Sequence, residues 1–164
     1  PLAPSLRTLR LIFFTMTFKQ KIKKQHLQLL QDKIDVYQDM ISGLSDDAQN
    51  DAKGSAGDKH ETALSMMHLE QEKLTNKLKE AIALKEILEK IDVSKTTPTI
   101  TLGSYVKVNA MQLFISAALP KTSVDGVTIL SVSPQSPLGS QLIGKKQHDI
   151  VVVNGNSFTI HEIL

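Results

Sequence analysis

Two stretches of helical periodicity, separated by a short polar segment, constrain the folding of this chain more than any other pattern in it. From about Phe18 to Ser45, bulky apolar residues recur at alternating intervals of three and four positions: Leu27, Leu30, Ile34, Tyr37, Ile41 and Leu44. From about Glu61 to Ile91 a second apolar stripe follows: Leu74, Leu78, Ala81, Leu84, Leu88 and Ile91. In the first stretch this spacing is an a/d heptad seam, so both stretches predict long amphipathic helices.

The segment from Ser45 to His60 is rich in Ser, Asp, Asn, Gly and Ala and holds no bulky apolar residue, which predicts a turn. Two amphipathic helices of similar length with a short connector pack antiparallel. At about 1.5 Å per residue, roughly 28 residues in each helix project about 40 Å. We therefore predict a helical hairpin (coiled coil) over residues 16–93. Its tip, at about residues 45–61, is presented to a partner.

A linker at residues 94–99, with Pro98 in it, separates this hairpin from a region of β character. Strand candidates are residues 100–108, 111–119, 127–132, 150–153 and 158–163, and Asn154-Gly155 indicates a tight hairpin turn. Ser136, Pro137 and Gly144 suit the N-cap, first turn and C-terminal cap of a short helix. The sequence thus predicts an α+β protein, with a small antiparallel sheet and one short helix over residues 100–164.

Composition excludes several classes of protein. The chain has 164 residues, a formal net charge of +2 and no cysteine, which excludes disulfides, thiolate zinc sites and cysteine nucleophiles. The near balance of charge argues against a strongly basic nucleic-acid binder. The apolar run Leu11–Phe14 is too short for a signal peptide or a membrane span. We expect residues 1–15 to be a non-structural N-terminal extension upstream of Met16, and the protein to be a cytoplasmic monomer without membrane contact.

The acidic residues Asp58 and Glu61 stand three positions apart at the start of the second helical stretch. Side chains at i and i+3 share a helix face, so the two carboxylates suit a shared Mg²⁺, which prefers oxygen ligands. The same pair also fits a capping box, in which both acids satisfy free backbone N–H groups of the first turn. Spacing alone leaves both interpretations open.

The other polar residues give weaker indications of a functional site. The five histidines form no close metal-binding pair on one helix face, and we expect them to be exposed or half-buried. The lysines at 19, 21, 23 and 24 suit either a solvated helix face or contact with RNA or phosphate. The sequence shows no glycine-rich phosphate loop and no nucleophile turn, so we expect no enzymatic pocket of its own.

Two segments resemble the Gre family of bacterial transcript-cleavage factors. Residues 52–63 resemble the family's tip, in which Gly-Asp is followed by two variable residues and then Glu-Asn-Ala. Ser136-Pro137-Leu138-Gly139, the run Leu142–Lys146, Asp149 and Glu162-Ile163-Leu164 resemble its C-terminal pattern. The resemblance covers residues 16–164.

The resemblance implies that the hairpin enters the secondary channel of RNA polymerase while an FKBP-like C-terminal domain docks on the channel rim. The docking residues it implies are Ser136, Pro137, Leu138, Gly139, Leu142, Gly144, Lys145 and Lys146. It further implies that Asp58 and Glu61, near the 3′ end of the nascent RNA, help hold a second Mg²⁺ of the polymerase, which cleaves its own backtracked RNA. No tightly bound cofactor and no intrinsic enzyme activity are expected.

The sequence departs from the family pattern at several positions. The family's Asn after the glutamate is Thr62 here, its Tyr is Ser65, and its C-terminal Tyr is His161. Two alternatives therefore stay open. One is a Gre-like regulator that blocks the channel without stimulating cleavage. The other is a coiled-coil adaptor or chaperone with an FKBP-like domain.

Overall fold

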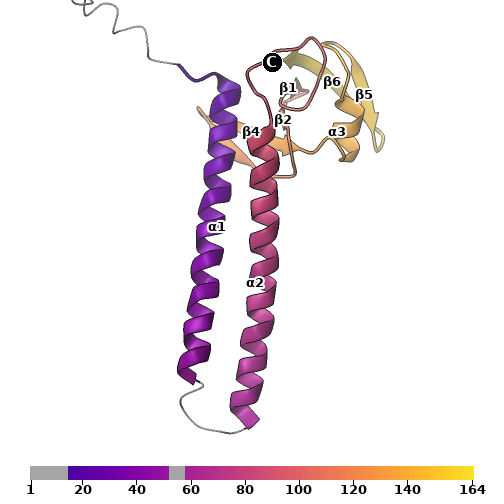
Figure 1. The fold of residues 1–164 in the computed structure, drawn as a ribbon. Coiled ribbons are helices and arrows are strands. Elements are labelled where there is room, and N and C mark those ends of the chain that lie inside the picture. The colour runs from indigo at the N-terminus through magenta and orange to yellow at the C-terminus, as the bar shows by residue number, and fades with distance from the viewer. Residues whose placement is uncertain (1–14, 52–57) are drawn as a thin grey trace, which may run out of the picture.

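The computed structural model describes residues 15–51 and 58–164, and its most prominent feature is a long antiparallel helical hairpin (Figure 1). Helix α1 spans Phe18–Asp51 and helix α2 spans Asp58–Lys90. The predicted hairpin is confirmed, but both helices are longer at the far end than the sequence indicated. Residues 46–51, predicted as part of a turn, continue α1. Of the described helices, none has the length and apolar character that a membrane span requires.

The two apolar stripes meet along the hairpin as the heptad spacing predicts. Leu30 and Ile34 of α1 and Leu74, Ala81 and Leu88 of α2 are buried. Among the described residues, hydrogen bonds between side chains join the two helices at two places: Lys85 Nζ donates to Gln31 Oε1 at 2.8 Å, and Gln71 Nε2 donates to Ser45 Oγ at 3.2 Å. The bonded residues are equally spaced on both helices, so one register holds between the two bonds.

The rest of the described chain folds into a six-stranded sheet with the order β3-β4-β2-β1-β6-β5. The strands are β1 (Tyr105–Val108), β2 (Met111–Ile115), β3 (Thr122–Val124), β4 (Val127–Val132), β5 (Ile150–Val153) and β6 (Asn156–Ile163). A short helix, α3 (Pro137–Leu142), follows β4. The α+β class is confirmed. Strand β3 is an element that the sequence did not predict.

The sheet is mixed, and in this respect the prediction of a purely antiparallel sheet was wrong. Strand β2 pairs in parallel with β4, whereas the other pairings in the described residues are antiparallel. The reason is topological. The chain leaves β2, forms β3 one strand further out, and returns through the turn at Asp125-Gly126 as β4 between them. Two reversals of direction make β4 parallel to β2.

The predicted turn and helix caps in the sheet region are confirmed. Asn154 and Gly155 have φ angles of 52° and 78°, as the tight turn between β5 and β6 requires. Ser136 is the N-cap of α3, and its Oγ accepts a hydrogen bond from the Gly139 N–H at 3.0 Å. Gly144 follows the helix with a φ of 79°, a conformation that glycine adopts without strain.

Each face of the sheet has its own core. One face packs against the base of the hairpin, where Ile22, Leu88 and Ile91 join Tyr105 and Phe114 in one buried cluster. The other face is covered by α3, with Leu142 buried among Val106, Leu113, Ile115, Val151 and Ile160. The hairpin is thus fixed to the sheet at one end, and its other end projects away from it (Figure 1).

Candidate functional site

The candidate site lies at the end of the hairpin farthest from the sheet, where α2 begins at Asp58. Glu61 follows one turn later on the same helix and is exposed. Residues three apart on a helix have Cβ atoms about 5–6 Å apart, so the backbone brings the two predicted acids together. The side chain of Asp58 lies outside the described part of the structure, as do residues 52–57 of the predicted tip.

Helix α2 reaches farther than α1 at this end. The register set by the two cross-helix hydrogen bonds places Asp51, the last residue of α1, opposite about Ser65 of α2. Residues 58–64 therefore extend past the end of α1 by about 10 Å, at about 1.5 Å per residue. Figure 1 shows the same offset between the two helix ends. Both acids of the predicted pair stand on this overhanging segment, a feature that sequence periodicity did not reveal.

The other acids of the predicted tip belong to α1. Asp46 and Asp47 lie in its last turns and are exposed, and Asp51 ends the helix. They were expected in a turn-forming connector, but the helix continues because Ser45 through Asp51 contain neither proline nor glycine to stop it. Ser45 Oγ donates to the Ile41 carbonyl at 3.1 Å within this last part of α1.

The chemistry available at the overhang is that of carboxylate oxygens. Among the described residues, no group of three or more His, Asp or Glu side chains is arranged to hold a metal ion. Two carboxylates one turn apart fit an ion such as Mg²⁺ that takes one or two protein carboxylates and completes its shell with water and phosphate. Asp58 and Glu61 thus suit an ion that a partner also binds, because two carboxylates alone do not complete its coordination shell. Their alternative role in capping α2 stays a prediction.

The residues predicted to dock on a partner fall into two structural groups. Gly139 and Leu142 are buried, and a Cβ on Gly139 would lie 2.0 Å from the Ser133 carbonyl oxygen. These two residues build the helix and do not offer a contact surface. Ser136 and Leu138 are half-buried, while Pro137, Gly144, Lys145 and Lys146 are exposed. Docking through this surface stays a prediction.

Three of the four lysines near the start of α1 contact other parts of the fold, whereas Lys24 is exposed, as expected for a solvated helix face. Contact of this cluster with RNA or phosphate stays a prediction. Lys19 is buried, and its Nζ donates to the Lys95 carbonyl at 2.5 Å. Lys23 Nζ donates to the carbonyls of Glu89 and Ile91 at 2.9 and 2.7 Å, at the C-terminus of α2. Lys21 pairs with Asp125 at 2.8 Å in the turn between β3 and β4. A cation near the last carbonyls of a helix is stabilising.

The expectation that the histidines are exposed or half-buried was wrong for His26. This residue of α1 is fully buried beside the sheet. Its ring nitrogens face the carbonyl oxygens of Ile22 at 3.2 Å and Pro120 at 3.3 Å. The ring lies nearly parallel to that of Phe114. Burial lowers the pKa of His26, and the hydrogen bonds to the two carbonyls oppose this effect. Its position four residues after Ile22 and before Leu30, on the apolar face of α1, was the signal that could have predicted this burial.

Comparisons with known proteins are sparse. No family model matches this sequence, and no curated protein does either. Among solved structures, one reported as the structure of the transcription factor Gfh1 is 16% identical, with 84% of this chain and 92% of that chain covered. Its TM-score is 0.33, a value at which the similarity carries no inference. The functional conclusions below therefore depend on the residues and geometry of this chain.

Proposed function

We propose that this protein is a Gre-like transcription elongation factor of the bacterial cytoplasm. It binds RNA polymerase by inserting the hairpin into the secondary channel and stimulates the polymerase's own cleavage of backtracked RNA. In this proposal the protein has no hydrolytic activity by itself. Asp58 and Glu61 contribute carboxylate ligands for Mg²⁺ in the active centre of the polymerase, close to the 3′ end of the nascent RNA.

One observation carries the proposal: the acids of the tip motif stand on a segment of α2 that extends past the end of α1, far from the sheet. Helix α2 begins at Asp58, and the exposed Glu61 lies on the segment that α1 does not flank. A narrow helical rod can enter a channel that a globular domain cannot. Its anchored end is held in a core shared with the sheet, so a contact made by the sheet region also orients the rod.

The charge and spacing of the pair suit this role. Carboxylates at i and i+3 offer oxygen ligands on one helix face, and the described part of the chain offers no further ligand cluster. When bound, Mg²⁺ activates water and stabilises charge on a phosphodiester oxygen. Two protein carboxylates are compatible with an ion that takes its remaining ligands from water and phosphate, and which the polymerase would help to hold.

The test is transcript cleavage in stalled elongation complexes, with wild type and the variants Asp58→Asn and Glu61→Gln. Each substitution removes one charge at nearly constant size, so cleavage stimulation should fall by about tenfold or more, by analogy with other losses at metal sites. Glu72→Gln is the matched control, because Glu72 is an exposed glutamate of α2 three turns nearer the sheet. Wild-type stimulation by both tip variants would rule out the assignment of metal-binding residues.

A second candidate function is favoured by the residues that follow the pair. Thr62 and Ser65 stand where the family pattern has Asn and Tyr, and both lie on the overhang or at its edge. A protein that enters the channel without orienting the substrate would block synthesis instead. Slower elongation by wild type with no shortened RNA would establish this second function. Restored cleavage in the Thr62→Asn, Ser65→Tyr double variant would identify these two residues as its cause.

A further inference from the structure

The outermost strand β5 presents two large apolar side chains to solvent. Ile150 and Val152 are 63% and 60% exposed, whereas Val151 between them is 4% exposed and packs in the core under α3. The pleat of a strand explains this alternation. Two exposed β-branched residues on a four-residue strand are unusual, because single exposed strands are normally protected by charge or proline.

The backbone of β5 is also open on one side. The turn at Asn154-Gly155 closes on the pair Val153–Asn156, and antiparallel bonding alternates from there, so Val151 and Val153 bond to β6. Ile150 and Val152 consequently direct their N–H and C=O groups away from the sheet. Since β5 has a neighbour only on its β6 side, no strand in the described chain pairs with these groups.

The opposite edge of the same sheet is protected. Strand β3 lies against α1, Thr122 and Val124 are buried, and Lys21 of α1 pairs with Asp125 at the adjoining turn. No strand of the described residues lies beyond β5, and α3 packs on its core face, where Val151 contacts the cluster around Leu142. The difference shows that the fold covers one edge itself and leaves the other open.

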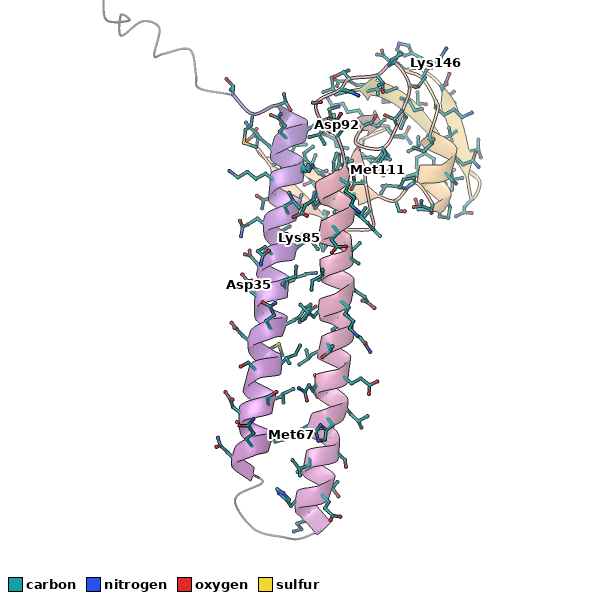
Figure 2. The ribbon with its side chains drawn as sticks, in the orientation of Figure 1. Asp35, Met67, Lys85, Asp92, Met111 and Lys146 are labelled. Atoms are coloured by element: carbon teal, nitrogen blue, oxygen red, sulfur yellow. The ribbon has the colours of Figure 1, made fainter. Side chains whose placement is uncertain are left out.

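A positive charge adjoins the open edge. Lys145 and Lys146 are exposed, lie a few residues before the first residue of β5, and form no ion pair with any described side chain. The nearest acid in sequence, Asp149, accepts a hydrogen bond from the Lys146 backbone N–H at 2.8 Å. Figure 2 shows Lys146 at an outer corner of the sheet region.

We propose that the open edge of β5 binds an extended segment of a partner protein as an added antiparallel strand. The segment carries apolar side chains at alternate positions, which pack beside Ile150 and Val152. It carries acidic residues at its C-terminal end, which an antiparallel arrangement brings toward Lys145 and Lys146. This proposal does not depend on the proposed role of Asp58 and Glu61, because it concerns the other end of the molecule.

Charge distinguishes this occupant from a second copy of the chain. A symmetric β5–β5 pair would bring Lys145 and Lys146 of each copy toward the Asn154-Gly155 turn of the other, where no acidic residue adjoins the strand. The two lysines would gain nothing from that contact. An acidic segment satisfies both the backbone groups and the lysines, and for this reason it is the occupant we propose.

The experiment uses the full chain and an eight-residue probe peptide, with valine and threonine alternating over five positions and three glutamates at the C-terminus. Titration followed by amide NMR should shift the Ile150 and Val152 resonances and slow their hydrogen exchange. N-methylation of peptide amides that face β5 should weaken binding by at least about tenfold, whereas methylation of the alternate amides should not. Absence of shifts at Ile150 and Val152, or equal effects of both methylation patterns, would overturn the proposal.

Two variants and one control peptide complete the test. Val152→Pro removes an outward N–H without removing a bond to β6, and it should abolish peptide binding. Val152→Thr keeps that N–H and should retain binding. If Val152→Pro perturbs the fold, Lys145→Glu combined with Lys146→Glu serves instead and should invert the preference to a peptide ending in three lysines. Concentration-dependent dimerisation that Val152→Pro removes, without peptide binding to wild type, would contradict the proposal in favour of a second copy.

Discussion

Near the sheet, the two hairpin helices share a buried core with Tyr105 and Phe114, whereas toward the far end the burial of their side chains declines. No residue of Asp35–Asn50 or of Lys59–Lys73 is fully buried, although Tyr37, Ile41 and Leu44 continue the seam as half-buried side chains. Figure 2 shows where these two parts lie, with Asp92 at the anchored end beside the sheet and Met67 toward the far end.

A thin helical rod can thus be both stable at one end and accessible at the other. We expect the anchored half to contribute most of the stability. There the two helices and the sheet all bury apolar surface against one another. The far half has only two helices to bury against each other. We therefore expect substitutions there to cost less stability, and its exposed polar side chains can contact a partner. Substitutions in the two halves should therefore differ in their effect on the stability of the protein.

The largest effect is expected from a cavity in the anchored half. Leu88→Ala removes a side chain with 0% exposure and should lower the free energy of unfolding by about 2–5 kcal/mol. Leu44→Ala, at a half-buried position of the same seam, should cost about 1 kcal/mol. Chemical denaturation followed by circular dichroism measures both. Equal losses would show that the two halves are equally packed and would contradict the difference in burial between them.

Lys23, at the base of the hairpin, is expected to contribute less than Leu88 to the free energy of unfolding. Lys23→Met keeps the aliphatic stem but removes the Nζ that binds the carbonyls of Glu89 and Ile91, and it should cost about 1 kcal/mol of unfolding free energy. Lys59→Met, at an exposed position in the first turn of α2 at the far end, is the matched control and should leave stability within about 0.5 kcal/mol. A larger loss from the control would contradict the assignment.

Acidification should act on the anchored half through His26. Because burial lowers its folded pKa below the ordinary value of about 6.5, the folded protein binds fewer protons than the unfolded chain between these two values. Stability is therefore fully present above about pH 7 and falls as the pH drops through 6.5 toward the folded pKa. Thermal unfolding from pH 7.5 to 5 should show this slope. His26→Gln should flatten the slope, while His68→Gln, at an exposed position in the far half, should leave it unchanged.

The smallest change in the free energy of unfolding is expected for a substitution of Gly43, in the far half of the hairpin. Gly43 lies inside α1, and a Cβ there would meet no atom within 4 Å. Gly43→Ala should stabilise the protein by up to about 1 kcal/mol, since alanine loses less backbone entropy in a helix. Unfolding free energy is again the measurement. Gly103→Ala is the counterpart at the anchored end, where a Cβ would lie 2.6 Å from the Asp92 carbonyl oxygen, and it should destabilise instead.

Local signals predicted much of the fold. The heptad spacing predicted both helices, and Asn154-Gly155 and Ser136-Pro137 marked a turn and a helix start that the structure confirms. The pair Asp58 and Glu61 was predicted from its motif, and the structure adds only that α2 begins there and overhangs α1. Residues that act through distant partners escaped prediction. Lys19, Lys23 and His26 bind carbonyls that lie far away in the sequence or across the hairpin base.

Periodicity and spacing within short segments were enough to predict the long hairpin, the β character of residues 100–164 and the acidic pair. The parallel pairing of β2 and β4, the core shared by the hairpin base and the sheet, and the contrast between covered β3 and open β5 are visible only in the folded chain. Those features depend on which surfaces meet after the chain has folded back on itself. Burial and strand pairing are properties of that meeting, and no single segment encodes them.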